Sequence, residues 1–388
     1  MNLNLDITQK STSISLCMIV KNEQKNLSRC LTSVQPYVDE MVIIDTGSED
    51  ETTEIAQKYG AKVEYFEWCD DFAAARNYAL SHVSNNWILM LDADEELVVH
   101  SKNFRDRLIS NQEIIAYQLM LTGPNPSVGT PALYTPRLFR NLPDLRYRYP
   151  LHEILHFQNQ PIPPNLIRSL DSLKIWHYGQ SESELKQEHL NRNIPILERA
   201  RQEEGLSLLL LYTLAGCYRD TQQTEKAEEC YAEAFERLLP HLMSGNPPEQ
   251  FGFVPSLMFT LGVISLREQD YETVMLLAQR GLEWCPSYPP LNYLAGSTLK
   301  ALGFPLGSVA YFETCLQLGR DNSYYKGEPF DRRYLTIYPA YDIGCVYMEM
   351  KRWESAKSAF QIALSFEDKL PEIEHKLQEI TKILADGL

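Results

Sequence analysis

The stretch "WILMLDADEE", residues 87–96, decides the fold that we predict for the first half of this chain. An apolar run leads here into four carboxylates within five positions. A short apolar run bounded by polar residues is typical of a strand that is covered on both faces of a sheet. Because carboxylates crowded this closely repel each other, we expect the acidic cluster to have a positively charged partner.

Similar apolar runs precede this stretch, with helical segments between them. The strand-like runs are 14–20, 41–45 and 62–66, and the helical segments are 24–35, 50–59 and 72–83. Ser48 and Glu51 form an S-x-x-E pattern that predicts the start of the second helix, and Gly60 predicts its end. This alternation indicates a mostly parallel sheet between layers of helices.

In such sheets ligands bind at the carboxyl ends of the strands, so the residues directly after each strand matter most. Those residues are "KNE" (21–23), "DTGSED" (45–50), "EWCDD" (67–71) and "DADEE" (92–96). Three of the four segments are strongly acidic. We expect all four to lie close together along the carboxyl ends of the strands, an edge that we call the rim.

The second half of the chain has a different period. Residues 104–180 contain strand-like pieces separated by proline-rich loops, which indicates a subdomain that completes the rim. From residue 183 the helical period dominates, and weak repeats have tetratricopeptide-like spacing. In the copy around "YDIGCVYMEM", small Gly344 and aromatic Phe360 are predicted to let paired helices approach closely.

Composition excludes some function classes. The net charge of −16 argues against general binding to nucleic acid or to anionic membranes. The most apolar run, 206–217, is shorter than the roughly 20 residues of a membrane-spanning helix, and the N-terminus shows no signal-peptide pattern. Eight scattered cysteines suit a reducing compartment, so we expect a cytoplasmic protein.

The acidic cluster itself has a chemical interpretation. Residues i and i+2 of an extended segment point to the same side, so Asp92 and Asp94 aim two carboxylates at one point. Hard oxygen donors placed together suit Mg²⁺ or Mn²⁺, and such a cation is a natural partner for a diphosphate. A solvated turn would give the same D-x-D pattern in a chain this acidic.

Four motifs in order carry a family resemblance. They are "ISLCMIVKNE" (14–23), "VIIDTGSEDET" (42–52), "FEWCDDFAAARNYAL" (66–80) and "WILMLDADEEL" (87–97). As an ordered set they resemble the family 2 glycosyltransferases, which have the α/β GT-A fold. With the repeats that follow, the chain is similar to a bacterial subgroup that includes peptide S-glycosyltransferases. Such relatives transfer a nucleotide-activated sugar with inversion.

This resemblance implies two domains. A GT-A domain would cover 1–182, with a nucleotide-sugar half at 12–100 and an acceptor half at 101–182. An all-α tetratricopeptide-like repeat domain would cover 183–388. The enzyme expected is a glycosyltransferase of the hexosyltransferase type.

The resemblance also implies roles at the donor side. The residues expected to bind the nucleotide sugar are Val20, Glu23, Asp45, Thr46, Arg76, Asn77, Asp92 and Ala93. Many family members have a second aspartate at the position of Thr46, which leaves open which residue reads the base.

Each of these positions also has a structural interpretation. Glu23 suits the N-terminus of a helix as an acid favoured by the dipole. Asp45 suits a turn cap, and Arg76 suits a salt bridge to Asp70 or Asp71. Glu95 and Glu96 are expected to begin the next helix for the same reason as Glu23.

The metal and the general base complete the predicted site. Asp92 and Asp94, with His177 at a strand end, would hold Mn²⁺ or Mg²⁺, and Asp94 is the expected direct ligand. A core or surface histidine is the alternative for His177. Glu153 fits the general base by position and type, and His152 is the alternative because its ordinary pKa lies nearer neutrality.

The sequence therefore predicts a metal-dependent inverting glycosyltransferase with a UDP-sugar donor. The acceptor would be a peptide or protein held by the repeats, which otherwise serve oligomerisation, for example as a homodimer. One rival is a non-catalytic scaffold with a degenerate transferase domain. Another is a sugar nucleotidyltransferase, but the loop "VKNEQKN" (20–26) lacks the glycines that such a phosphate loop uses.

Overall fold

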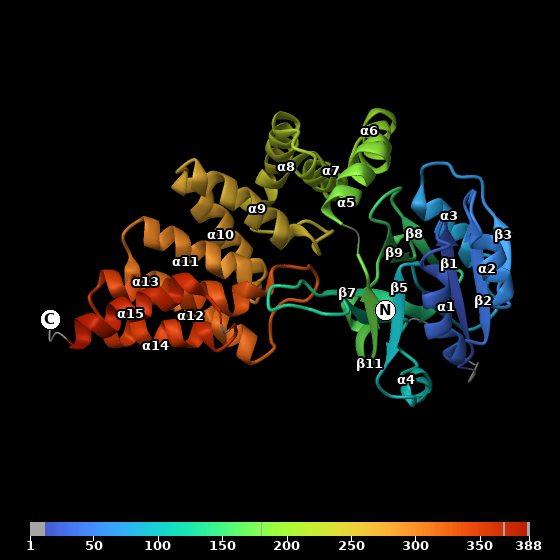
Figure 1. The fold of residues 1–388 in the computed structure, drawn as a ribbon. Coiled ribbons are helices and arrows are strands. Elements are labelled where there is room, and N and C mark those ends of the chain that lie inside the picture. The colour runs from blue at the N-terminus through green and yellow to red at the C-terminus, as the bar shows by residue number, and fades with distance from the viewer. Residues whose placement is uncertain (1–11, 180, 368, 386–388) are drawn as a thin grey trace. The chain divides into compact units, whose positions relative to one another are not determined.

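The computed structural model describes residues 12–179, 181–367 and 369–385. The chain divides into two compact units, coloured along the sequence in Figure 1. The first comprises the residues up to Asn125 and Leu133–Cys230, and the second comprises Pro126–Ala132 and Tyr231–Leu388. The first unit thus continues beyond residue 182, where the sequence places a domain boundary.

An eight-stranded sheet organises the first unit, in the order β3-β2-β1-β4-β7-β6-β11-β5. The first four strands in that order run parallel, and β7 and β5 run antiparallel to their neighbours. The predicted, mostly parallel sheet of an α/β GT-A fold is therefore confirmed. The strands are β1 (Ile14–Val20), β2 (Glu40–Asp45), β3 (Lys62–Tyr65), β4 (Trp87–Met90), β5 (Glu95–Val99), β6 (Ala116–Thr122), β7 (Leu133–Arg140) and β11 (Ile167–His177).

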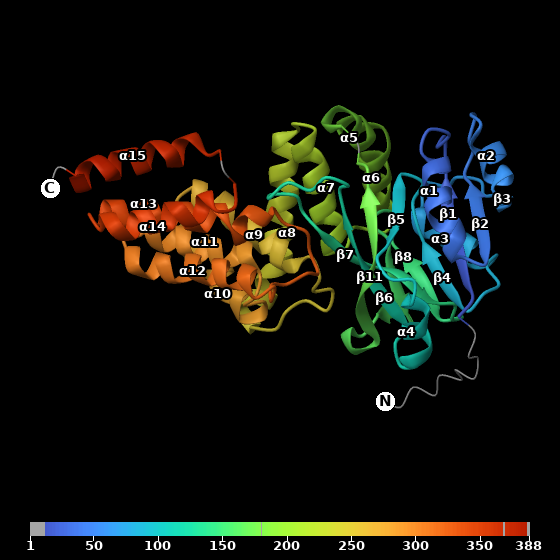
Figure 2. The ribbon, with the colours of Figure 1, turned by 60° about the horizontal axis from the view of Figure 1, so that its bottom comes forward.

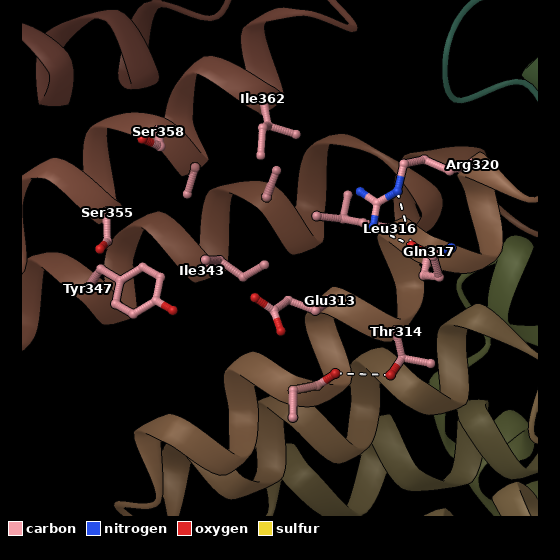
Figure 3. A pocket seen from close by; sticks show the side chains of 13 residues that line it. Glu313, Thr314, Leu316, Gln317, Arg320, Ile343, Tyr347, Ser355, Ser358 and Ile362 are labelled. Carbon is pink, nitrogen blue, oxygen red and sulfur yellow. Dashed lines mark hydrogen bonds between the residues drawn. The ribbon is translucent and has the colours of Figure 1, made fainter.

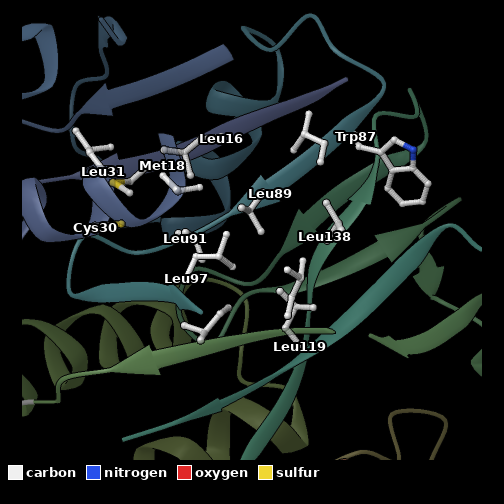
Figure 4. Packing of buried hydrophobic residues seen from close by; sticks show 14 of the residues in the cluster. Leu16, Met18, Cys30, Leu31, Trp87, Leu89, Leu91, Leu97, Leu119 and Leu138 are labelled. Atoms are coloured by element: carbon white, nitrogen blue, oxygen red, sulfur yellow. The ribbon is translucent and has the colours of Figure 1, made fainter. Parts of the chain in front are cut away.

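The central strands are buried on both faces, as their apolar runs predicted. Leu16 of β1 and Leu89 of β4 belong to one apolar cluster, part of which Figure 4 shows. Cys17 and Met90, their neighbours in sequence, belong to the cluster on the other face. Alternate residues thus enter different cores, which is why these strands read as continuous apolar runs.

Helices cover both faces of the sheet (Figure 2). Helices α1 (Leu27–Val34), α2 (Thr52–Lys58) and α4 (Phe104–Ser110) contribute to one cluster, and α3 (Phe72–Leu80) contributes to the other. Short 3₁₀ turns occur at Gln35–Tyr37 and Pro164–Leu166.

One predicted helix boundary is confirmed and another is wrong. Gly60 follows the end of α2 with a left-handed φ of +78°, which glycine adopts without strain. The predicted Ser48–Glu51 capping box is wrong, because α2 begins only at Thr52. The Ser48 hydroxyl instead accepts a hydrogen bond from the backbone N–H of Asn22, at 2.9 Å.

A small three-stranded sheet and the turn after β4 shape the rim. The small sheet contains β8 (Leu145–Arg148), β9 (Ile154–Phe157) and β10 (Gln160–Pro161). The expectation that Glu95 and Glu96 begin a helix is wrong: they begin β5, which pairs antiparallel with β11. This pairing outweighs the local preference of acids for helix N-termini, and it sets His177 opposite Glu95.

Helices follow the sheet to the end of the described chain. The first unit contains α5 (Glu182–Glu188), a π-helical turn (His189–Asn193), α6 (Ile194–Glu203) and α7 (Leu208–Asp220), and α8 (Thr224–Ser244) crosses the division. The second contains α9 (Val254–Arg267), α10 (Tyr271–Trp284), α11 (Pro289–Ala301), α12 (Pro305–Arg320), a 3₁₀ turn (Arg332–Leu335), α13 (Ile337–Glu349), α14 (Trp353–Leu364) and α15 (Pro371–Ala385). Within the described residues, none of these helices combines the length and apolar character of a membrane span.

Close approach of paired helices confirms the predicted role of small residues in the repeats. A methyl group on Gly344 of α13 would lie 2.5 Å from Cε1 of Phe360 on α14. Gly296 of α11 faces Phe312 of α12 in the same way, at 2.6 Å. In both pairs a fully buried aromatic ring occupies the space beside the glycine.

We expect Gly344→Ala to destabilise the second unit by about 1–3 kcal/mol, because the methyl group overpacks the contact with Phe360. The free energy of unfolding can be measured by urea titration. The control is Gly216→Ala in α7, where a methyl group meets nothing within 4 Å. That control should be neutral or stabilising, by up to about 1 kcal/mol, because alanine favours helices. A Gly344→Ala protein as stable as wild type would contradict the proposed packing.

Candidate functional site

The candidate site lies at the carboxyl end of β4, where the chain turns into β5. The backbone N–H of Glu95 donates to the carbonyl of Asp92 at 3.1 Å, and the N–H of Asp92 donates to Oε2 of Glu95 at 2.9 Å. These two hydrogen bonds close the turn that carries Asp92 and Asp94. The two aspartates have different partners, although the D-x-D spacing predicted that they would share one.

Asp94 pairs with His177. Oδ2 of Asp94 lies 2.9 Å from Nε2 of His177, and the carbonyl of Asp94 accepts from the N–H of Tyr178 at 3.3 Å. The hydrogen bond to Asp94 raises the pKa of His177 above its usual value. Both side chains remain partly accessible, at 25% and 41% exposure. The structure thus brings Asp94 and His177 together, and their role as metal ligands stays a prediction.

Aromatic and charged groups flank His177. The Arg29 guanidinium lies 3.6 Å from the centre of the Tyr178 ring, and the Tyr178 hydroxyl donates to the carboxylate of Glu96. The hydrogen bond thus joins Tyr178, the residue after β11, to Glu96 in β5. This arrangement holds the end of β11, and with it His177, against the turn.

Asp92 lies between two arginines. Nη2 of Arg76 donates to Oδ1 at 2.9 Å, and Nη2 of Arg137 donates to Oδ2 at 3.2 Å. The side chains of Arg76 and Arg137 are only 9% and 14% exposed. Burial by itself would raise the pKa of Asp92, but the two guanidinium groups outweigh it and hold that pKa far below the usual range.

Each arginine has a second carboxylate partner. Nε of Arg76 donates to Oε1 of Glu153 at 2.5 Å, and Nη2 of Arg137 donates to Oε1 of Glu95 at 2.6 Å. Glu95 is almost fully buried, which raises its pKa to about 7 against the opposing effect of Arg137. We call the sequence Glu153–Arg76–Asp92–Arg137–Glu95 the ion chain. Positive and negative groups alternate along it.

The position of Arg76 on α3 explains its reach. Its neighbours Ala73, Ala75 and Ala79 are small and buried, which leaves room for the guanidinium beneath the rim. The predicted alternative, a salt bridge to Asp70 or Asp71, is absent among the described contacts of Arg76. Asp71 instead caps α3 by accepting from Ala74 N–H at 2.9 Å, and Asp70 pairs with Arg199 at 2.8 Å.

Two guanidinium nitrogens of the ion chain have no hydrogen-bond partner among the described residues. They are Nη1 of Arg76 and Nε of Arg137, both buried. Buried donors are normally satisfied, because an unmade hydrogen bond costs about 1–3 kcal/mol. These nitrogens therefore mark a place where water or an anionic ligand would be stabilised.

The remaining donor-side residues lie around the first two strand ends. Val20 is buried at the end of β1, and the Thr46 hydroxyl donates to its carbonyl at 3.0 Å. Asp45 accepts from the N–H groups of Gly47 and Ser48 at 3.2 and 3.1 Å, the geometry of the turn-cap interpretation. Burial raises the pKa of Glu23, which accepts from Asn26. Contact of Val20, Glu23, Asp45 and Thr46 with a nucleotide stays a prediction.

Asn77 already has partners for both ends of its amide. Nδ2 donates to the carbonyl of Tyr147 at 2.9 Å, and Oδ1 accepts from the Tyr147 N–H at 2.8 Å. This clamp ties α3 to β8 and places the Tyr147 ring 5.7 Å from the Arg76 guanidinium. Ala93 is buried in the turn. The expected nucleotide contacts of Asn77 and Ala93 stay predictions.

The two candidate bases are neighbours in sequence but differ in surroundings. Glu153 is bonded to Arg76 and is 14% exposed. His152 is exposed and has a left-handed φ of +52°, which is uncommon for a residue with a side chain. Only Glu153 joins the ion chain, and the choice of base stays a prediction.

Sequence reasoning missed Arg137 and Glu95. The period of two along a strand offers one signal. If residues 95–99 form a strand, Glu95 lies on the same face as the apolar Leu97 and is therefore buried. Arg137 lies within the strand-like run "LYTPRLFR", residues 133–140, where a charge on a buried strand needs a partner. The identity of that partner depends on strand pairing that the sequence does not state.

The donor atoms near Asp94 suit a divalent cation. Carboxylate oxygen and imidazole nitrogen together are ligands that Mn²⁺ accepts, and Mg²⁺ takes carboxylates. Within the described parts of the chain, no group of three or more His, Cys, Asp or Glu side chains is arranged to hold a metal ion. Asp94 and His177 thus offer two ligands, while the carboxylate of Asp92 is engaged by arginines.

A cavity of about 640 Å³ lies within the second unit, between α12, α13 and α14 (Figure 3). Its lining combines hydroxyl groups of Thr314, Tyr347, Ser355 and Ser358 with apolar Ile343, Leu316 and Ile362. One acid, Glu313, and one base, Arg320, also line it. Such a mixed lining suits a polar ligand with apolar parts better than a metal.

Comparison with known families gives two matches within the chain. Residues 15–102 match the family described as glycosyl transferase family 2, and residues 209–237 match a tetratricopeptide repeat. The first match contains Arg76, Asp92 and Asp94, and ends before Arg137 and His177.

Three relatives show the extent of the similarity. A TPR repeat-containing protein of Synechococcus elongatus is 40% identical over 179 residues, which are 45% of this chain and 44% of that protein. An uncharacterized glycosyltransferase of Rickettsia conorii is 34% identical over 140 residues, 34% of this chain and 47% of that one. The SPbeta prophage-derived glycosyltransferase SunS of Bacillus subtilis is 29% identical over 194 residues, 48% and 44% of the two chains. The chain spans less than half the length of each relative.

We expect Arg76→Met to destabilise the first unit by about 3–5 kcal/mol, because it leaves Glu153 without its buried cation. Adding Glu153→Leu should recover part of that loss, since an apolar pair of similar volume is often as stable as a buried ion pair. Urea titrations of the two single variants and the double variant measure the coupling. Additive losses would show that the Arg76–Glu153 contact is not formed in solution.

Proposed function

We propose that this chain, which carries a glycosyl transferase family 2 domain and a tetratricopeptide repeat, is a glycosyltransferase that uses a divalent cation. Its donor would be a nucleotide sugar, with UDP as the nucleotide. The observation that carries the proposal is the Asp94–His177 pair, which lies beside the buried ion chain at the carboxyl end of β4. This is the edge of an α/β sheet where ligands bind.

Asp94 and His177 would hold the cation. Mn²⁺ or Mg²⁺ bound there would neutralise charge on the diphosphate as it leaves the sugar. The pairing of β5 with β11 fixes both side chains on the same side of the turn before any ligand binds. Such preorganisation means that little reorganisation is required when the donor arrives.

The donor would lie across the ends of β1, β2 and β4. Val20, Glu23 and Asp45 would contact the nucleoside, and Arg76 would lie beneath the phosphates. The unpartnered nitrogens of Arg76 and Arg137 offer buried hydrogen-bond donors to phosphate oxygens or to ordered water. Arginine suits this task because its fork of donors matches the geometry of phosphate.

Glu153 would act as the general base. Arg76 donates a hydrogen bond to Oε1 of Glu153. This bond fixes the carboxylate, so that Oε2 would be the oxygen that takes the proton. In an inverting transfer the acceptor attacks from the face opposite the departing diphosphate, and one base that takes the acceptor proton is sufficient. His152 is the alternative base, and its exposed side chain is free of the ion chain among the described contacts.

The helical repeats would bind a peptide or protein acceptor. Stacked helix pairs form extended surfaces that recognise other chains, and the matched tetratricopeptide repeat supports such an interaction. Self-association of the repeats into a homodimer is the alternative. A scaffold without transferase activity remains the rival from another functional class, and it predicts no donor turnover.

We expect UDP to bind only when Mn²⁺ is present, and both Asp94→Ala and His177→Ala to weaken that binding at least about tenfold, through loss of a ligand. Isothermal titration of UDP with and without Mn²⁺ measures this. The control is His100→Ala, since His100 is an exposed histidine that directly follows β5 and lies outside the pair. Binding of UDP that is equally tight without metal, or unaffected by Asp94→Ala, would refute the metal-dependent mechanism.

We expect slow donor hydrolysis from one member of a panel of nucleotide sugars, read as free nucleoside diphosphate. Glu153→Gln should lower that rate by about 10²–10⁴-fold with UDP affinity little changed, because the base acts in the transition state. His152→Gln is the matched comparison. If His152→Gln removes activity and Glu153→Gln retains it, the assignment of the base is reversed. If every donor stays intact beside an active control transferase, the scaffold is favoured.

A further inference from the structure

Asp92 and Asp94 are two residues apart, yet the structure separates their partners. Asp94 lies against His177, while Asp92 is bonded to Arg76 and Arg137. We infer that Arg137 and Glu95 form a positioning pair, which keeps Asp92 on the arginines and out of the coordination shell of the cation. This inference rests on the proposed function, because it concerns the cation that Asp94 and His177 would hold.

A closed ring of three hydrogen bonds carries the inference. Nη2 of Arg137 donates to Oδ2 of Asp92 at 3.2 Å and to Oε1 of Glu95 at 2.6 Å. The other oxygen of Glu95 accepts from the backbone N–H of Asp92 at 2.9 Å. Glu95 thereby holds both the arginine and the backbone of Asp92. Neither the position nor the rotation of the Asp92 side chain is left free.

Strand pairing brings Arg137 to this place. β7 runs antiparallel to β4, with Leu138 opposite Leu89, so Arg137 lies beside the last residue of β4. Residues 137 and 139 share a face of β7. Phe139 belongs to the core cluster on the face that also contains α3 and its Arg76. Arg137 therefore reaches Asp92 from the same face of the sheet as Arg76, and the two guanidinium groups donate to different oxygens of Asp92.

Charge balance gives Arg137 its effect on the cation. The ion chain has three carboxylates and two guanidinium groups, so its net charge is −1 when all five are ionised. Without Arg137, Asp92 keeps only Arg76, and its Oδ2 loses its hydrogen bond. That oxygen is then free to turn toward a cation bound by Asp94, two residues along the turn. Loss of the positive charge of Arg137 also strengthens cation binding at Asp94, because it removes a repulsion.

The inference is tested by Mn²⁺ affinity, measured without nucleotide by electron paramagnetic resonance of the free ion. We expect Arg137→Met to bind Mn²⁺ about tenfold more tightly than wild type, the lower end of the effect of groups that orient metal ligands. The double variant Arg137→Met with Asp92→Asn should return to the wild-type affinity, because the released carboxylate is gone. Damage to the structure alone would lower affinity and would not raise it.

Arg140→Met is the matched control. Arg140 lies on the same strand and is buried, but it donates to the carbonyl of Ile114 at 2.9 Å and stacks on Trp87. Its loss should leave Mn²⁺ affinity unchanged, although it removes an arginine from β7. Circular dichroism shows whether each variant is folded. If Arg137→Met does not fold, Arg137→Gln serves as the second variant, because its shorter, uncharged side chain also releases Oδ2 of Asp92, and a gain of the same size is expected.

Three outcomes overturn the inference. One is a folded variant with unchanged or weaker Mn²⁺ binding, and another is a gain that persists in the double variant. Absence of Mn²⁺ binding in both wild type and Arg137→Met also overturns it, since the released carboxylate then makes no ligand. The proposed function fails separately, when wild type shows no metal-dependent binding of UDP.

Discussion

Neutralisation of Asp92 at the end of β4 is the interaction on which the rest of the site depends. Arg76 and Arg137 are buried, and a buried charge is unstable unless opposite charges and hydrogen bonds replace its hydration. Asp92, whose side chain is 35% exposed, pairs with both arginines, and each arginine has a further carboxylate partner. These ion pairs join α3, β5, β7 and the segment before β9 to the turn after β4. The rim is therefore built as one electrostatic unit.

That unit explains how the two aspartates acquire different chemistry. Both carboxylate oxygens of Asp92 accept hydrogen bonds from arginines, whereas the side chain of Asp94 pairs with one histidine among the described contacts. A divalent cation needs ligands whose charge is not already neutralised. Under the proposed function, Asp94 with His177 would hold the metal, and Asp92 would orient Arg76 beside the donor.

The local features were predictable from sequence, and the long-range ones were not. The strands at 14–20 and 87–90 follow from apolar runs, and Asp94 and His177 follow from motif and strand-end position. The preference of acids for helix N-termini predicts a helix at Glu95, yet pairing with β11 places it in a strand. Arg137 is missed because its position beside Asp92 depends on the antiparallel register of β7 with β4, which no local sequence pattern specifies.

The ion chain also changes how a substitution at Asp92 must be interpreted. Loss of activity in an Asp92 variant would ordinarily suggest a lost metal ligand. Here removal of that carboxylate would leave Arg76 and Arg137 close together, buried, and with repulsive charges. Arg76 also holds Glu153, so the disturbance would reach the candidate base on the small sheet. Activity alone therefore does not separate the roles of Asp92 and Asp94, whereas metal affinity does, because only Asp94 lies against His177.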